Sequence, residues 1–330
     1  MKTYKTYGES KFETEIVEPS ARNDLIKVRV THVLPSKSDV SIFNGESSIR
    51  YPFIIGHSAI GVISDDRPEY GLKRGTKVIL NPYTEGELSR LDGEPSVSIS
   101  GLNEDGFMRE YVFMEKEKIV AFPEDVDEEE AIFTESIAVA LKVLNSFTLE
   151  KGDYIAIVGG DVISNLIAQL AMYFQLVPIV IDSNESNLAH AEKCGVYYTI
   201  NETKESPISR VKEITCDRMV EETVVDLSDS TSPAFVFSLS RESGKCVILS
   251  ENKVVKAFDA DVSMICKRQL RIRGINNGDS EFDSAINILA QKIINFDGFI
   301  DKVVEMKDAE IVLRELKNNP DRYFNVVIKL

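Results

Sequence analysis

Between residues 128 and 275, apolar segments with strand character alternate with helical segments, and this alternation is the strongest constraint on the fold. The segment YIAIVGG predicts a strand, Val162–Phe174 predicts a helix, and the strand VPIVID and a helix over Glu185–Lys193 follow. Further strands are predicted at Tyr197–Ile200, Thr223–Leu227, Lys245–Ser250 and Leu270–Ile275. Strands joined through helices run parallel, with right-handed crossovers. The pattern therefore predicts an α/β fold with a doubly wound parallel sheet.

The N-terminal third has a different pattern, in which short alternating strands are separated by turns. Strands are predicted at Leu25–Val33, Ile60–Ser64, Lys77–Leu80, Met108–Met114 and Ile119–Phe122. The polar stretch Asn81–Asp105 has no sustained period and is predicted to be a long loop. Helices near Glu281–Asn295 and Asp308–Asn318 and a strand in FNVVIKL complete the chain. A β-rich domain therefore precedes the α/β domain, and 330 residues suffice for two cores.

The charge balance and the apolar segments exclude two classes of partner. The net charge is −16, and no Lys/Arg stripe could follow a phosphate backbone, so a nucleic-acid partner is not expected. No apolar run approaches the roughly 20 residues that span a bilayer, and the N-terminus lacks the apolar core of a signal peptide. We therefore expect a cytoplasmic protein with no membrane partner.

The turn IVGGDVISN lies where a dinucleotide site needs a glycine-rich turn between a strand and a helix N-terminus. Gly159 occupies the first glycine position of GxGxxG, but Asp161 and Ser164 occupy the second and third. The candidate cofactor contacts are Gly159, Gly160, Asp161 and Val162. Asp161 has two interpretations: it caps the helix where a phosphate would lie, or it turns away and admits a dinucleotide.

Asp182 ends the second strand of the α/β domain, 23 residues after Gly159. An acidic residue there can hydrogen-bond the adenosine ribose of NAD and disfavours the 2′-phosphate of NADP. The alternative is that Asp182 caps the helix in IDSNESNL. If a dinucleotide binds, NAD is therefore preferred over NADP.

Several motifs resemble one enzyme family. The segment VTHVLPSKSDVSIFNGESSIRYPFIIGHSAIGVI is similar to the signature region of zinc-type medium-chain dehydrogenases, which include the alcohol and polyol dehydrogenases. GFMREYV, AIFTESIAVAL and CVILSENKVVKAFDADVSMICKRQLRIRGI extend the resemblance over nearly the whole chain, and the ribitol-phosphate dehydrogenases look nearest. The resemblance implies a GroES-like catalytic domain over 1–136 and 277–330 and a Rossmann domain over 137–276. It also implies a homodimer formed through the strand LRIRGI.

The family's zinc ligands map onto this sequence incompletely. The cysteine ligand corresponds to Ser36, the histidine to His57, the neighbouring glutamate to Ser58, and the helix ligand to Glu135. His57 and Glu135 remain as possible metal ligands, and a serine hydroxyl is a poor substitute for a thiolate. We therefore expect zinc to be weak or absent.

Two further residues match the family's catalytic positions, and each candidate has an ordinary structural alternative. Asp39 matches the aspartate beside the metal and could accept a hydrogen bond from His57, and Ser38 matches the hydroxyl that relays the substrate proton. In the structural alternative, His57 is a hydrogen-bonded turn residue, Glu135 a first-turn acid and Ser38 a local backbone cap. The other two histidines, His32 and His190, are expected to be structural.

Two functions fit these motifs. The first is an NAD(P)-dependent oxidoreductase for an alcohol, polyol or carbonyl substrate, without a full catalytic zinc site. The second is a non-catalytic or regulatory homologue that keeps the fold and binds a small molecule or a partner protein. The altered metal ligands and the altered phosphate turn favour the second, and the whole-chain resemblance favours the first.

Overall fold

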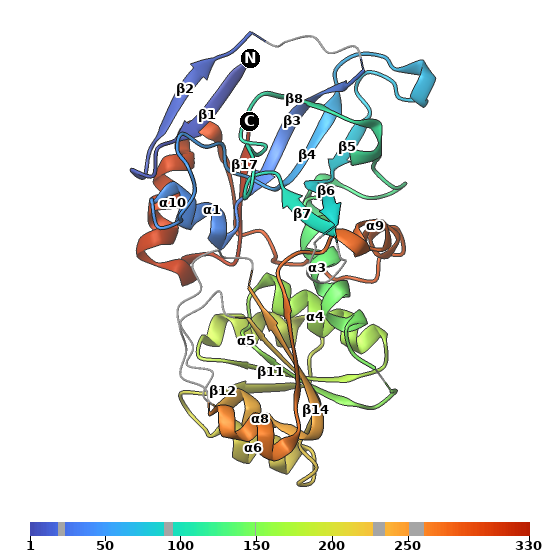
Figure 1. Ribbon diagram of the computed structural model, residues 1–330, viewed down its shortest axis with the longest axis vertical. Coiled ribbons are helices and arrows are strands. Elements are labelled where there is room, and N and C mark those ends of the chain that lie inside the picture. Colours follow the sequence, from blue (N-terminus) through green and yellow to red (C-terminus); the bar gives the residue numbers. More distant parts are fainter. Residues whose placement is uncertain (19–23, 89–94, 149, 227–234, 251–260) are drawn as a thin grey trace. The chain divides into compact units, whose positions relative to one another are not determined.

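The computed structural model describes residues 1–18, 24–88, 95–148, 150–226, 235–250 and 261–330 (Figure 1). By its internal contacts the chain divides into two compact units: Met1–Glu135 with Ile300–Leu330, and Ser136–Phe299. This division differs from the predicted boundaries at 277–299, which belong to the second unit. Gln169 explains part of that assignment, because its side-chain amide accepts a hydrogen bond from the Asn295 backbone at 2.8 Å.

The second unit contains a six-stranded parallel sheet in the order β12-β11-β10-β13-β14-β15. Its strands are β10 (Tyr154–Val158), β11 (Val177–Asp182), β12 (Tyr198–Asn201), β13 (Val220–Asp226), β14 (Ser240–Leu249) and β15 (Arg271–Ile275). The chain first builds outward from β10 to β12 and then returns to build from β13 to β15. This confirms the predicted doubly wound sheet, and its order reverses between β10 and β13, where α/β proteins bind ligands.

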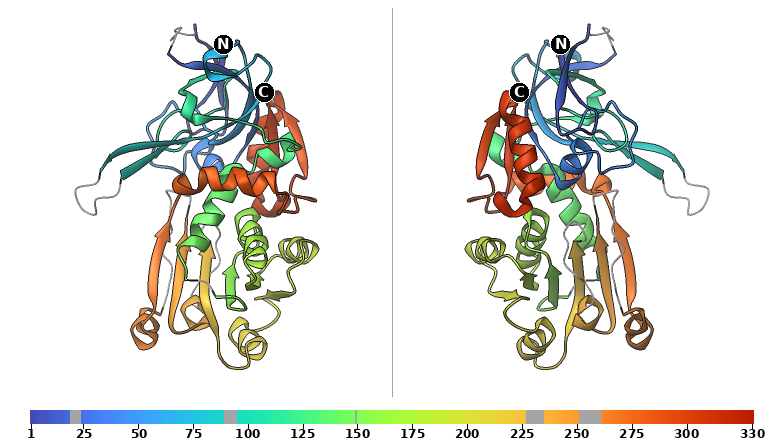
Figure 2. Two further views of the ribbon diagram at one scale, coloured as in Figure 1. Left: turned by 90° about the vertical axis from the view of Figure 1, so that its right-hand side faces the viewer. Right: turned by 90° about the vertical axis from the view of Figure 1, so that its left-hand side faces the viewer.

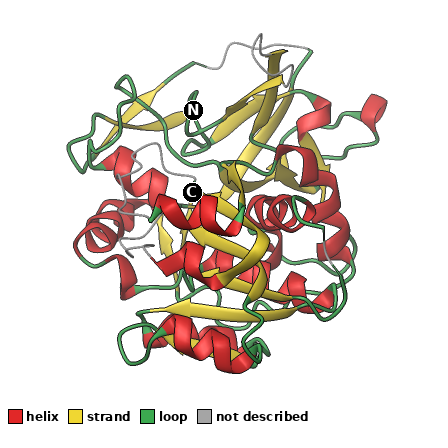
Figure 3. Ribbon diagram, turned by 60° about the horizontal axis from the view of Figure 1, so that its bottom comes forward, coloured by secondary structure: helices red, strands yellow, loops and turns green. Residues whose placement is uncertain are grey.

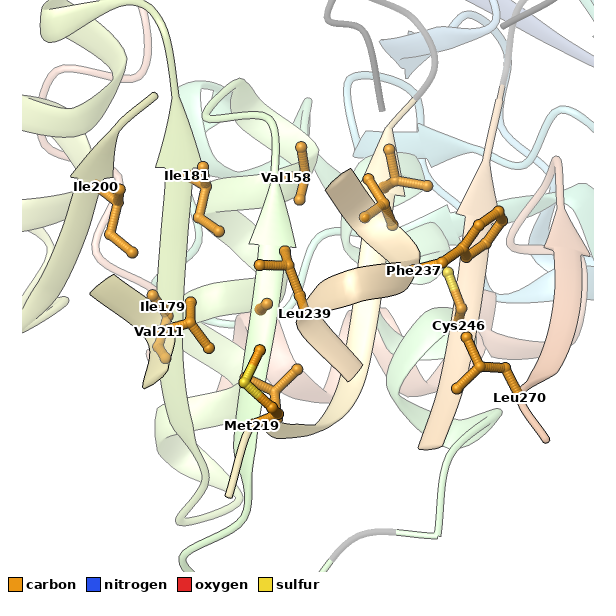
Figure 4. Packing of buried hydrophobic residues seen from close by; sticks show 14 residues of the cluster. Val158, Ile179, Ile181, Ile200, Val211, Met219, Phe237, Leu239, Cys246 and Leu270 are labelled. Atoms are coloured by element: carbon orange, nitrogen blue, oxygen red, sulfur yellow. The ribbon is translucent and has the colours of Figure 1, made fainter. Parts of the chain in front are cut away.

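Helices cover both faces of this sheet (Figure 3). They are α4 (Val162–Tyr173), α5 (Glu185–Lys193), α6 (Pro207–Ile214), α7 (Val236–Leu239) and α8 (Val262–Arg268). One buried cluster joins Ile179, Ile181 and Ile200 of the strands to Val211 of α6 and Phe237 of α7 (Figure 4). Helices α4 and α5 contact β10 to β12 from outside this cluster, so they cover the opposite face. The continuous apolar runs of β10 and β11 follow from this burial on both faces.

The first unit is built on a seven-stranded sheet in the order β16-β17-β3-β4-β5-β9, with β8 paired to β3. The strands are β3 (Ile26–Leu34), β4 (Ser58–Ile63), β5 (Lys77–Leu80), β8 (Tyr111–Met114), β9 (Ile119–Ala121), β16 (Lys302–Glu305) and β17 (Val326–Lys329). The hairpin of β1 (Lys2–Thr6) and β2 (Phe12–Ile16) and the helices α1 (Lys37–Phe43) and α10 (Ala309–Asn318) also belong to this unit. The predicted β-rich organisation is therefore confirmed.

The prediction of a long loop over Asn81–Asp105 is wrong. β6 (Tyr83–Leu88) and β7 (Pro95–Ile99) form an antiparallel hairpin, with Tyr83 paired to Ile99, that extends away from the large sheet (Figure 2). Residues 89–94 lie outside the described part. The sequence does not predict this hairpin because β6 is largely polar and the alternation in β7 is limited to Val97 and Ile99, too short a pattern to indicate a strand.

The segment EEEAIFTESIAVALKVLNSF forms two helices, α2 (Glu128–Ala131) and α3 (Thr134–Asn145). At the division, the Thr134 hydroxyl donates to the Ala131 carbonyl at 2.7 Å and Asp127 caps α2. The predicted helix near Glu281–Asn295 is α9 (Phe282–Ala290). In the described part of the chain, no helix is long and apolar enough to cross a membrane.

Glu222 of β13 is an unusual core residue of the second unit. The residue is 5% exposed, and its carboxyl Oε2 has no hydrogen-bond partner among the described residues. Burial raises the pKa of Glu222 from 4.5 to about 8, although Lys245 on the neighbouring strand opposes the shift. At neutral pH the folded protein therefore retains a proton that the unfolded chain releases.

This raised pKa predicts that the second unit becomes less stable as pH rises. Between the ordinary carboxyl pKa of 4.5 and about 8, the folded state binds the extra proton, so stability is greatest below this window and falls through it. Glu222→Gln removes the cost of burying a charged carboxylate, about 1–3 kcal/mol, and raises the melting temperature more at pH 9 than at pH 5. Scanning calorimetry at the two pH values measures the difference. Glu242→Gln, an exposed position on β14, is the control, and equal shifts for both variants would contradict the prediction.

Candidate active site

His57 lies immediately before β4, in a turn whose backbone is held on both sides. Gly56 has φ +95°, its N–H donates to Asp39 Oδ1 at 2.7 Å, and its carbonyl accepts from the Phe107 N–H at 2.8 Å. A Cβ on Gly56 would lie 2.7 Å from the Val33 side chain, so the turn needs glycine for space as well as for its backbone conformation. These constraints fix His57, which is 2% exposed.

Ser36 and Asp39 form the N-terminal cap of α1. Asp39 N–H donates to Ser36 Oγ at 3.2 Å, and Asp39 Oδ2 accepts from the Ser36 N–H at 2.8 Å and from its hydroxyl at 3.1 Å. This reciprocal arrangement is a capping box. Ser36, which occupies the family's cysteine position, is therefore engaged in starting the helix. Ser38 is buried in the first turn of α1.

Asp39 also approaches His57, but the predicted hydrogen bond is not formed. Asp39 Oδ2 lies 3.4 Å from His57 Nδ1, and Nδ1 has no hydrogen-bond partner among the described residues. The Asp39 residue is fully buried, and its carboxylate lies beside the imidazole while it also takes part in the N-terminal cap of α1.

On its other side, the imidazole faces Glu135 of α3. His57 Nε2 lies 3.8 Å from Glu135 Oε2, and Glu135 is 5% exposed. Ser58 Oγ lies 3.4 Å from the same oxygen, and the Tyr83 phenol donates to Glu135 Oε1 at 2.5 Å. The structure therefore brings together His57, Asp39 and Glu135, as expected from the family positions. It adds Tyr83, which the sequence did not indicate because it begins the unrecognised hairpin.

The donor set does not fit a family-type zinc site. Among the described residues, no three His, Cys, Asp or Glu side chains are arranged to hold a metal ion. Asp39 faces Nδ1 of His57 whereas Glu135 faces Nε2, so the two carboxylates do not converge on one point. The Ser36 hydroxyl, the third candidate position, donates to Asp39. Two ligands remain where a catalytic zinc takes three.

The second group of predicted residues lies in the turn between β10 and α4. Gly159 has φ +112°, a conformation that favours glycine, and its N–H donates to the Ile181 carbonyl at 2.8 Å. Asp161 is the N-cap of α4 and accepts from the Ser164 N–H at 3.1 Å, and Val162 is the first helical residue. The backbone therefore has the form of a phosphate-binding turn, but the acidic cap already takes one of the N–H groups that a phosphate would use.

Asp182 is close to this turn. A Cβ on Gly160 would lie 2.7 Å from Asp182 Oδ2, so Gly160 allows the two backbone segments to approach. Asp182 Oδ1 accepts from the Asn184 N–H at 2.7 Å and Oδ2 from Asn187 Nδ2 at 3.1 Å, while Asn184 itself caps α5. The carboxylate thus organises the turn before α5, and burial together with the Asp182 charge raises the pKa of Glu202.

Known proteins resemble both units. Residues 22–124 match the alcohol dehydrogenase GroES-like domain, and residues 163–291 match the zinc-binding dehydrogenase family. The chain is 24% identical to an uncharacterized zinc-type alcohol dehydrogenase-like protein of Haemophilus influenzae, with 94% of this chain and 93% of the relative covered. It is 26% identical to the D-arabitol-phosphate dehydrogenase of Enterococcus avium, with 92% and 93% covered.

A solved structure agrees with these matches in fold. The short chain alcohol dehydrogenase of Escherichia coli CFT073, complexed with its cofactor NADH, superposes with a TM-score of 0.83 at 19% identity, covering 100% of this chain and 99% of that one. The GroES-like unit, the Rossmann sheet and the two family matches agree with one another. The chain therefore belongs to the medium-chain dehydrogenase/reductase superfamily, the family of the zinc-type alcohol and polyol dehydrogenases.

Proposed function

We propose that this protein is an NAD(P)-dependent oxidoreductase that interconverts a hydroxyl and a carbonyl group on a polyol or related sugar. The proton is handled by His57 and Glu135 without a full catalytic zinc site. The observation that carries the proposal is the 3.8 Å separation between His57 Nε2 and Glu135 Oε2 in a buried cluster. The relatives named above, one of them a polyol-phosphate dehydrogenase, support the reaction class.

The separation suits a substrate oxygen better than it suits a direct bond. At 3.8 Å the two atoms are too far apart to hydrogen-bond each other. An oxygen about 2.8 Å from each atom can donate to the carboxylate and accept from the imidazole N–H at the same time. Glu135 then takes the hydroxyl proton, and the imidazole N–H stabilises the developing negative charge on oxygen.

The surrounding residues hold these two groups in place. Tyr83 fixes Glu135 through Oε1, which leaves Oε2 for the substrate, and Ser58 contacts Oε2 from the β4 side. Asp39 lies behind the imidazole at Nδ1 and orients the ring so that Nε2 faces the substrate oxygen, to which Nε2 donates when it carries the ring hydrogen. Ser38 stays in the proposal as the relay hydroxyl.

The cofactor would lie at the carboxyl edge of the parallel sheet, at Gly159, Gly160, Asp161 and Val162, with Asp182 toward the ribose. A bound nicotinamide would accept the hydride that leaves the substrate carbon. The left-handed Gly159 and the N-terminus of α4 favour this placement, and the Asp161 carboxylate weakens it. The preference for NAD over NADP, the homodimer through LRIRGI and the cytoplasmic location stay predictions.

Cofactor titration and metal analysis of the purified protein test the proposal together. We expect NADH to enhance its fluorescence on binding with a lower Kd than NADPH, less than one zinc per chain, and oxidation of a polyol or polyol phosphate that a chelator does not abolish. If neither NADH nor NADPH binds at millimolar concentration, the proposed oxidoreductase activity is overturned. One zinc per chain together with chelator-sensitive activity overturns the metal-free site.

A further inference from the structure

A cavity of about 210 Å³ lies in the first unit, on the sheet that contains β3, β4, β5 and β17. Figure 1 labels these four strands. Its polar lining comprises Arg29, Thr31, His32, Lys77, Glu128 and Lys329, and its floor is apolar. None of these residues belongs to the His57 cluster. The cavity is smaller than the roughly 300–1,000 Å³ of sites for drug-sized ligands, so it suits a small group.

The strand register brings the basic side chains to one place. Arg29 pairs with Val62 across β3 and β4, and Val62 pairs with Lys77 across β4 and β5, so the two basic residues flank Val62 on one face of the sheet. Lys329 pairs with His32 on the other side of β3. With strands about 4.8 Å apart, the Arg29 and Lys77 backbones are about 10 Å apart, which two long side chains can bridge around a shared anion.

The charges in the cavity are not balanced. Lys77 pairs with Glu128 at 2.7 Å, and Lys329 lies 3.9 Å from Glu305, the outer limit of an ion pair. Arg29 has no ion-pair partner among the described residues. Lys77 and Lys329 are therefore each partnered by a carboxylate, and the Arg29 guanidinium is the positive charge of the lining that these two pairs leave unbalanced.

The remaining polar groups supply neutral hydrogen-bonding sites. Burial lowers the pKa of His32, so its imidazole is neutral at neutral pH, and its Nδ1 lies 3.2 Å from the Thr31 hydroxyl. The neighbouring backbone is fixed in the sheet, with the Thr31 hydroxyl donating to the Ile60 carbonyl at 3.3 Å. The cavity thus combines a rigid floor with a free guanidinium, whose planar fork binds phosphate oxygens in pairs.

We propose that this cavity binds the phosphate group of a small metabolite, with Arg29 as the principal ligand and Lys77 and Lys329 as supporting charges. The site is separate from the acid–base cluster and does not depend on the proposed oxidoreductase activity. Glu128 sets its selectivity, because its carboxylate holds Lys77 and repels an anion that fills the cavity beyond one phosphate group.

Isothermal titration of the full-length protein with inorganic phosphate, at constant ionic strength maintained with chloride, tests this site. We expect saturable binding at one site per chain, a Kd raised at least tenfold by Arg29→Ala, and an intermediate effect for Arg29→Lys, which keeps the charge but loses the fork. Lys73→Ala, an exposed basic position in the same unit, leaves the Kd unchanged. Lys77→Ala provides a second weakened variant if Arg29→Ala does not fold.

Two results overturn the assignment. The first is phosphate binding no stronger than that of chloride at the same ionic strength. The second is a Kd that Arg29→Lys and Lys77→Ala leave unchanged. Neither result affects the NADH titration, so the proposed phosphate site and the proposed oxidoreductase activity can be rejected independently of each other.

Discussion

Replacing His57 by Gln lowers kcat/KM for NAD(P)-linked polyol oxidation by about 10²- to 10⁴-fold, the usual contribution of a positioned acid–base group. The loss is expected because the imidazole is the group that faces Glu135 across the 3.8 Å space and has Asp39 behind it. Glutamine keeps the polarity of the position but, unlike imidazole, cannot take up or release a proton. Steady-state kinetics with a saturating cofactor measure the effect.

Two matched variants separate chemistry from folding. His190→Gln replaces a histidine of α5 in the second unit, outside the acid–base cluster, and is expected to leave kcat/KM within about twofold. Tyr83→Phe removes the hydroxyl that bonds Glu135 and is expected to lower kcat/KM by about 10- to 100-fold, in line with the roughly 1.5–3 kcal/mol of a hydrogen bond to a charged group. Unchanged activity in a folded His57→Gln protein would remove His57 from the mechanism.

Asp161→Asn is expected to tighten NADH binding by at least tenfold. Two unit charges about 4 Å apart repel by about 1 kcal/mol in water and about 4 kcal/mol at the effective dielectric of a protein surface, so a diphosphate near this carboxylate loses much of its affinity. Asparagine is an equally good N-cap, so α4 keeps the hydrogen bond from Ser164 N–H while the charge is removed. Nicotinamide fluorescence titration measures the change in Kd.

Two controls accompany this test: the salt dependence of the NADH affinity, and a variant at an acidic residue far from the turn. The gain from Asp161→Asn shrinks at 1 M salt, where charges are screened beyond about 3 Å. Asp217→Asn, which removes a carboxylate beyond the C-terminus of α6, leaves the affinity unchanged. If Asp161→Asn binds NADH no better than the wild type, the carboxylate is not the obstacle.

Much of the fold could be predicted because local pattern and tertiary environment agree. β10 and β11 are apolar along their whole length, and they are buried on both faces. The helices α4 and α5 are likewise preceded by Asp161 and Asn184, residue types that favour N-caps. In the β6–β7 hairpin the local sequence pattern does not match the structure. Its strand pairing depends on contacts that the hydrophobic pattern of the segment does not predict.

The sequence predicts those residues of the candidate site that lie in a family motif. It does not predict a residue that reaches the site only through the folding of the chain. His57, Asp39 and Glu135 were recognised from the family pattern. Tyr83 reaches Glu135 over 52 residues of sequence, a distance at which spacing carries no information. The spacing of Ser36 and Asp39 fits a capping box, whereas the family resemblance points to Ser36 as the position of a zinc ligand.

The start of α1 determines how a thiol could be accommodated at position 36. A cysteine there would supply the family's ligand type but would lose the bonds between the Ser36 hydroxyl and Asp39, at a cost of about 1 kcal/mol in helix capping. The Asp39 carboxylate would still accept from the backbone N–H of residue 36 and from the Gly56 N–H. The turn before His57 would therefore keep its support, and the cost of the exchange would fall on the first turn of the helix.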